Sequence, residues 1–108
     1  MGGAYFMAKT HITIDLGKLT NAISNYEIII SDFEQAVKET EEAIKTLKSS
    51  GWKSSASTQY FLTYENTWKK NMKKRIEVIK HLKKCLEKAK NEYQGIYDEM
   101  NQLDSALN

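Results

Sequence analysis

The sequence predicts an all-α protein: an antiparallel two-helix hairpin that dimerises into a four-helix bundle. Three observations support this. The 108 residues contain no proline, so none of the strongest helix breakers is present. Apolar residues recur in steps of three and four on both sides of one short interruption. That interruption, Ser49-Ser50-Gly51, has the small residues that end helices. We expect one domain spanning 1–108, with an N-terminal extension at 1–14, a first helix at 15–48, a turn at 49–54 and a second helix at 55–105.

The first helix is predicted from an apolar stripe that runs from Leu16 to Leu47, with Thr40 at the one polar position. Its steps alternate between three and four residues over more than four heptads, which is typical of one long amphipathic helix. The residues before it, 10–14, are expected to be strand-like. The stripe consists of Leu16, Leu19, Ile23, Tyr26, Ile30, Phe33, Val37, Ile44 and Leu47.

The second helix is predicted in the same way, with Ser54 or Ser55 as its N-cap. Glu65 and Arg75 interrupt its stripe. Because Arg75 would occupy a position where leucine is expected, we predict an acidic partner from the first helix, with Glu27, Asp32 and Glu34 as the candidates. The stripe consists of Phe61, Trp68, Met72, Ile79, Leu82, Leu86, Ala89, Tyr93, Ile96, Met100, Leu103 and Leu107.

The apolar face is wider than the seam of two helices requires, because further apolar residues, such as Ile28 and Ile29, lie beside the stripe. A lone hairpin would leave this surface in water, so we expect a second copy to cover it. The predicted dimer core is Ile23, Tyr26, Ile30, Phe33, Val37, Trp68, Met72, Ile79, Leu82 and Leu86. The second helix is also predicted to be the longer one. Its end, from Lys90 onward, should project past the first helix and contact another chain or serve as an exposed recognition element.

The turn contains Trp52, Ser54, Ala56 and Tyr60, and here the chain resembles the WXG-100 (ESAT-like) family of helical hairpins exported by bacterial type VII secretion systems. In that family a tryptophan opens the turn, a glycine follows at plus two, and a small residue and an aromatic follow at plus four and plus eight. This chain has Ser54 in place of the glycine. Serine fits there if the backbone is not left-handed.

The resemblance implies a small secreted protein, or a partner or targeting factor of a larger toxin, that works by dimerisation and protein–protein interaction. The implied partners are a second copy, a homologous or toxin chain, and the membrane ATPase of the secretion system. No general signal peptide is apparent, so the implied route is from the cytoplasm through the type VII system.

The resemblance also implies a C-terminal export signal, an aromatic residue followed by an acid four positions later. Tyr93 and Tyr97 are followed at that spacing by Tyr97 and Asn101. A looser pattern, a hydrophobic residue, an acid and a second hydrophobic residue, fits Met100, Asp104 and Leu107.

The residues do not indicate an enzyme, and we expect no catalytic group, cofactor, metal or small-molecule substrate. The single cysteine and the two separated histidines offer no ligand set. Residues 52–108 hold 11 basic and 7 acidic side chains, which leaves one alternative: a cytosolic coiled-coil module with a basic face that binds nucleic acid or an anionic membrane. The interpretation we favour is a solvated face that complements the acidic first helix, without nucleic-acid binding.

Overall fold

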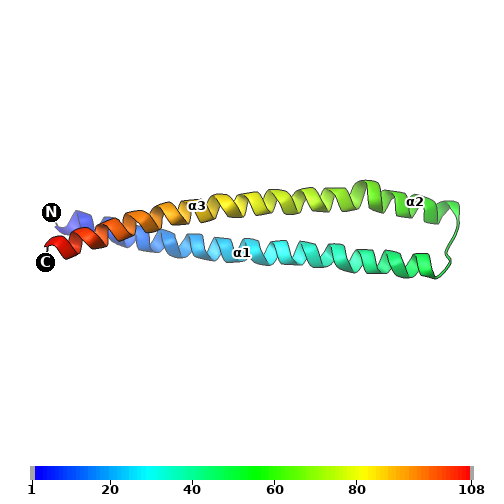
Figure 1. Ribbon diagram of the computed structural model, residues 1–108, viewed down its shortest axis with the longest axis horizontal. Helices are drawn as coiled ribbons and strands as arrows, with labels where there is room; N and C mark the ends of the chain where they lie inside the picture. Colours follow the sequence, from blue (N-terminus) through cyan, green and yellow to red (C-terminus); the bar gives the residue numbers. More distant parts are fainter. Residues whose placement is uncertain (1, 108) are drawn as a thin grey trace. The chain divides into compact units, whose positions relative to one another are not determined.

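The structure is a computed structural model that describes the backbone of residues 2–107 and the side chains of residues 7–107. It consists of α1 (Gly2–Ser49), α2 (Ser55–Thr63), the π-helix η1 (Tyr64–Trp68) and α3 (Lys69–Leu107) (Figure 1). Because α2, η1 and α3 follow one another directly, they form one continuous second helix. No strand occurs within residues 2–107. The predicted all-α helical hairpin is confirmed.

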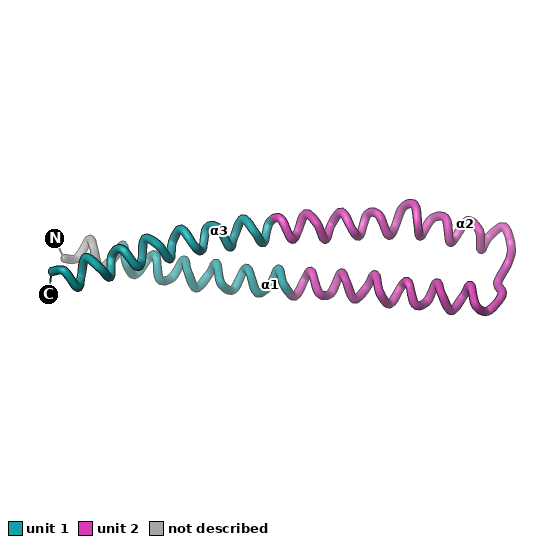
Figure 2. The backbone as a smooth tube through the Cα atoms, in the orientation of Figure 1, with its two compact units in different colours: residues 1–27, 82–108 teal, residues 28–81 magenta. Residues whose placement is uncertain are grey.

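The chain divides into two compact units, which Figure 2 shows in different colours. Unit 1 combines the residues up to Glu27 with those from Leu82 onward, and unit 2 comprises Ile28–His81. Each unit therefore holds one segment of α1 and one segment of the second helix.

In unit 2 the two segments are antiparallel. Lys80 Nζ lies 3.2 Å from Glu34 Oε1, and Lys69 Nζ lies 3.0 Å from Glu41 Oε1. The residue numbers in these pairs therefore rise on α1 as they fall on α3. The hydrophobic side chains buried between the segments are Ile44, Tyr64 and Met72, which are 5%, 5% and 8% exposed.

Unit 1 is also antiparallel. Lys83 Nζ lies 3.3 Å from Glu27 Oε1, and Lys9 Nζ lies 2.8 Å from Asp104 Oδ2. The described side chains of this unit are all half-buried or exposed. Its core is therefore more open than the core of unit 2.

The start of α1 differs from the prediction. The helix begins at Gly2 rather than near residue 15, and it includes the residues expected to be strand-like. The β-branched sequence from Thr10 to Ile14 suggested a strand, but packing overrides this weak local preference. Ile12 is half-buried, and the Thr13 hydroxyl donates to the Lys9 carbonyl at 3.0 Å, as it can in a helix. The end of α3 consequently lies against α1 in unit 1, so the prediction of a tail projecting past the first helix is wrong.

The residues of the second helix that face α1 also differ from the predicted stripe. The π-helix places Tyr64, rather than Glu65, in the interior. A π-turn takes up an extra residue, and the inward positions after it pass through Met72, Ile76 and Ile79. Arg75 is therefore exposed.

The predicted acidic partner of Arg75 is not observed. Glu34 and Glu27 are paired with Lys80 and Lys83, and no acidic side chain among residues 7–107 pairs with Arg75.

Candidate protein-interaction site

The turn between α1 and α2 is fixed by two residues with different backbone conformations. Gly51 has φ +78°, a left-handed conformation that suits glycine. Ser54 has φ −165° and ψ 173°, which is extended backbone that any residue adopts. A serine can therefore stand where the resembled family has a glycine.

Ser54 is the N-cap of α2. Its hydroxyl accepts a hydrogen bond from the Ser57 backbone N–H at 3.1 Å, and the Ser54 N–H donates to Ser57 Oγ at 2.8 Å. These two bonds form a capping box, which satisfies two backbone donors that the helix start would leave unpaired.

Three aromatic rings surround the start of α2. The ring centroid of Trp52 lies 5.8 Å from that of Tyr60 and 5.9 Å from that of Phe61. Lys48 Nζ lies 5.2 Å from the Phe61 centroid, which joins the end of α1 to this cluster. Trp52 remains 38% exposed and Tyr60 remains 45% exposed. The cluster therefore secures the end of the hairpin and presents an aromatic surface. Ala56, the fourth predicted turn residue, is exposed in the first turn of α2.

Lys9 brings two of the candidate export-signal residues together. Its Nζ lies 5.5 Å from the ring centroid of Tyr97 and 2.8 Å from Asp104 Oδ2. Tyr93 and Met100 are half-buried, whereas Leu107 is 76% exposed. The sequence prediction missed Lys9 because it ended the apolar stripe at Leu16; extending the same three–four spacing backward through residue 12 reaches Lys9.

One edge of the helix seam in unit 2 is charged. We define this charged flank as Glu34 and Glu41 of α1 with Lys69 and Lys80 of α3. Residues seven apart lie on the same side of a helix, so the two glutamates share an edge. The Lys69 hydrogen bond lowers the pKa of the Glu41 carboxyl, and the same bond raises the pKa of Lys69. In unit 1, hydrogen bonding to Glu27 raises the pKa of Lys83 in the same way.

Tyr64 lies beside the charged flank with its ring stacked on Trp68 at a centroid distance of 5.4 Å. Its hydroxyl is buried and has no hydrogen-bond partner among the described residues. Burial raises the pKa of this phenol, and the neighbouring Glu41 carboxylate adds to the effect. Tyr64 therefore stays neutral.

The opposite edge of unit 2 is mainly apolar. We define this apolar flank as Ile29, Ala36 and Ala43 of α1, each seven residues apart, with Trp68, Arg75 and Val78 of the second helix. Ile29 is 39% exposed and Val78 is 59% exposed.

Two hollows of about 260 and 300 Å³ open beside the apolar flank. The first is lined by Phe33, Lys74, Arg75, Val78 and Ile79. The second is lined by Thr40, Tyr60, Thr63, Tyr64 and Trp68.

Unit 1 also carries exposed apolar side chains on α3. Leu82, Ile96 and Leu103 are 42%, 43% and 49% exposed and lie at multiples of seven residues along the helix. With Ala89 between them, they occupy one side of α3.

The predicted dimer-core residues mostly lie at the seam of the hairpin itself. Met72 is buried and Leu82 is exposed. The half-buried members are Ile23, Tyr26, Ile30, Phe33, Val37, Trp68, Ile79 and Leu86.

Within the described part of the chain, no group of three or more His, Cys, Asp or Glu side chains could hold a metal ion. No helix among these residues is long and apolar enough to cross a bilayer.

These features define a class of small helical hairpin proteins with a tryptophan at the turn and apolar surface beside the seam. The WXG100 family, described as proteins of 100 residues with WXG, matches residues 11–99. The chain belongs to this family. No curated protein and no solved structure matches it. WXG100 proteins are small, non-enzymatic helical proteins associated with type VII secretion.

Proposed function

We propose that this chain is a type VII secretion substrate, or the targeting partner of a larger one, and that it works as a dimer. Membership of the WXG100 family supports the secretion role. The observation that carries the dimer is the apolar flank: Ile29 and Val78 are exposed directly beside a core in which only Ile44, Tyr64 and Met72 are buried hydrophobic residues among those described. A helix pair docked on this flank would remove it from water.

The accessible surface supports the same proposal. The chain exposes 8065 Å². A compact monomer of 12.4 kDa exposes about 6,100 Å². The excess is at least as large as the area that one partner covers in a stable interface.

For export, we propose that the secretion ATPase recognises the end of α3 through Tyr93, Tyr97, Met100, Asp104 and Leu107. The physical support is that Tyr97 and Asp104 share one contact, Lys9, and that Leu107 presents an exposed apolar side chain. An aromatic ring, a carboxylate and an apolar side chain on one helix suit helix-in-groove docking.

The structure offers less support for a basic face that binds nucleic acid or membrane. Three lysines in the basic part of the sequence form ion pairs with glutamates of α1: Lys69, Lys80 and Lys83. Ion pairs within the hairpin reduce the charge available to phosphates.

Sedimentation of the purified protein tests the dimer. Wild type should sediment at about twice 12.4 kDa. Ile30→Asp should unfold or aggregate, because it places an unpaired charge in the half-buried seam. A well-folded wild-type monomer at micromolar concentration would refute the dimer.

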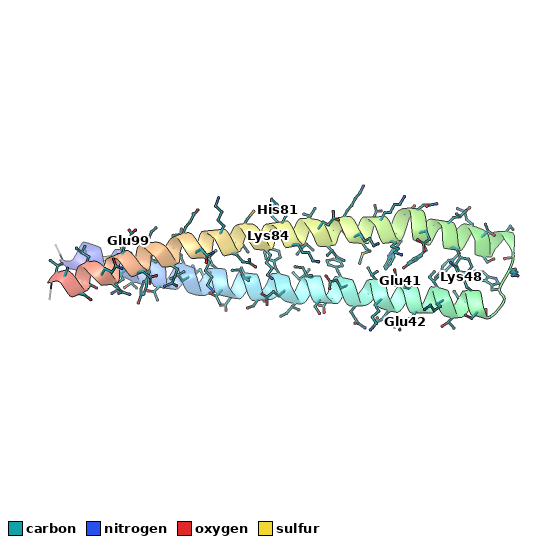
Figure 3. All side chains as sticks on the ribbon, viewed as in Figure 1. Glu41, Glu42, Lys48, His81, Lys84 and Glu99 are labelled. Carbon is teal, nitrogen blue, oxygen red and sulfur yellow. The ribbon has the colours of Figure 1, made fainter. Side chains whose placement is uncertain are left out.

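Culture supernatants test the export site. Tyr97→Ala and Asp104→Ala should each lower secretion while the dimer persists. Glu99→Ala is the matched control, since Glu99 is an exposed acid on the same part of α3 (Figure 3). Normal secretion of both variants would place the recognition surface elsewhere, and the exposed aromatic cluster at Trp52 would be the next candidate.

A further inference from the structure

We propose that the apolar flank of unit 2 docks on the same flank of a second copy of this chain, and that Arg75 of each protomer pairs with Asp32 of its partner. The proposal rests on the dimer proposed above. It adds the face that is covered and the ion pairs that join the two copies.

Arg75 supplies the first half of the pair. It is exposed, it pairs with no acidic side chain among residues 7–107, and it lines an apolar hollow with Phe33, Val78 and Ile79. A helix that fills this hollow would bring its own side chains against the guanidinium. An arginine at the edge of a buried apolar contact needs a carboxylate to offset its loss of water.

Asp32 supplies the second half. It is exposed and follows Ile29 by three residues, so it lies on the same side of α1 as the apolar flank. On the other edge, the acids Glu34 and Glu41 are already paired with lysines. Glu39 shares a side of α1 with Asp32, but it accepts a hydrogen bond from Gln35 at 3.1 Å. Asp32 is therefore the acid of this face for which the structure shows no bond.

The two halves lie on one surface of unit 2, which is the condition for a self-complementary interface. In a two-fold dimer, every contact between residue i and residue j of the partner is made twice. Two Arg75–Asp32 pairs would then flank the buried contacts of Ile29 and Val78. A partner with a different sequence would need an acid and an arginine in the same places, whereas a second copy supplies both.

Charge reversal tests the pairing. Arg75→Glu alone should place a second carboxylate against Asp32 of the partner, and Asp32→Arg alone should place two guanidinium groups together. We expect each variant to weaken the dimer at least about tenfold, since like charges in a contact are costly. Mixing the two variants in equal amounts should restore a dimer. In the mixed dimer, one contact joins the original Asp32 and Arg75, and the other joins the two substituted residues. Both contacts therefore join opposite charges, whereas in each unmixed variant both contacts join like charges.

Native mass spectrometry can identify the mixed dimer, because the two chains differ in mass, while circular dichroism reports helicity. Glu39→Arg mixed with Arg75→Glu is the control. Glu39→Arg alone should remain dimeric, because it keeps both Arg75 and Asp32. Its mixed dimer with Arg75→Glu retains one contact between two carboxylates, so it should form more weakly than the mixed dimer of Arg75→Glu and Asp32→Arg. If the wild type is dimeric and mixing restores nothing, the Arg75–Asp32 pairing is wrong and the proposed function survives. A monomeric wild type would overturn both.

Discussion

Ser54 takes the place of the glycine of the family turn and takes part in both hydrogen bonds of the capping box, of which glycine could make only one. Its hydroxyl accepts from the Ser57 N–H, whereas the bond from its own N–H to Ser57 Oγ needs no side chain at position 54. Among the residues whose backbone the structure describes, the left-handed one is Gly51, three positions earlier.

We expect Ser54→Ala to destabilise the protein by about 1 kcal/mol, and Ser54→Gly by only a few tenths, because glycine leaves the cap open to water. Thermal unfolding followed by circular dichroism measures both. Ser55→Ala is the control, since Ser55 is exposed and is already helical. Equal losses for Ser54→Ala and Ser55→Ala would argue against the capping box.

At the scale of elements, the pairing of α1 with α3 combines apolar contacts with cross-helix ion pairs. The ion pairs are at or near the surface, so each adds little stability by itself. Their position along one edge matters more, because it leaves the other edge of unit 2 free for an apolar contact.

The charged flank should make stability depend on pH. The lowered pKa of Glu41 means that its contribution is present above the ordinary glutamate pKa and is lost as the pH falls through the lowered value. The raised pKa of Lys69 means that its contribution is present below the ordinary lysine pKa and is lost as the pH rises through the raised value. Thermal unfolding across the pH range should therefore show losses at both extremes.

Glu41→Gln should reduce the fall in unfolding temperature at low pH, whereas Glu42→Gln should leave this fall unchanged. Glu41 lies on the side of α1 that faces the second helix, and Glu42 points away from it (Figure 3). The same fall at low pH in both variants would show that the Glu41–Lys69 pair does not contribute.

The N-terminal part of α1 and the C-terminal part of α3 depend on each other through Lys9. We expect Lys9→Ala to lower the free energy of local opening of residues 93–107 by less than about 1 kcal/mol, because it removes an ion pair that is partly open to water. Hydrogen exchange of the α3 amides measures this local opening. Lys18→Ala, at an exposed lysine of the same unit, should leave the exchange unchanged.

For the molecule as a whole, a dimer predicts that the unfolding temperature rises with protein concentration, by mass action. Ile29→Asp should lower the unfolding temperature and remove its dependence on protein concentration, since Ile29 lies on the apolar flank. Ile28→Asp is the matched control: Ile28 is 58% exposed and lies on the outer side of α1. The same loss in both variants would count against the apolar flank as the interface.

The sequence predicted the two helices and the turn because the absence of proline, the three–four spacing and the Ser49-Ser50-Gly51 interruption all agree. It did not predict which of two neighbouring stripes on α3 would face α1. Met72 and Ile79 belong to the stripe that faces α1. Leu82 and Ile96 belong to the neighbouring stripe, whose side chains are exposed. Both stripes are apolar, so spacing alone cannot separate a contact within the hairpin from a surface left outside it.

The start of α1 was missed for a different reason. The β-branched residues from Thr10 to Ile14 have weak helical preference by themselves, and only their packing within unit 1 reveals the helix. Tyr97 and Asp104 were proposed from the sequence as export residues, and that role stays a prediction. The contact that joins them could not be predicted, because it depends on Lys9, which lies 95 residues from Asp104 in the chain.

That distance along the chain has a kinetic consequence. In an antiparallel pair, contacts near the turn close short loops, whereas the Lys9–Asp104 contact closes a loop of nearly the whole chain. Loop-closure entropy grows with length, so pairing should form first near the turn and last at the termini. The termini are also where fraying is least costly. The proposed export residues therefore lie where the two helices can separate most readily while their pairing near the turn stays intact.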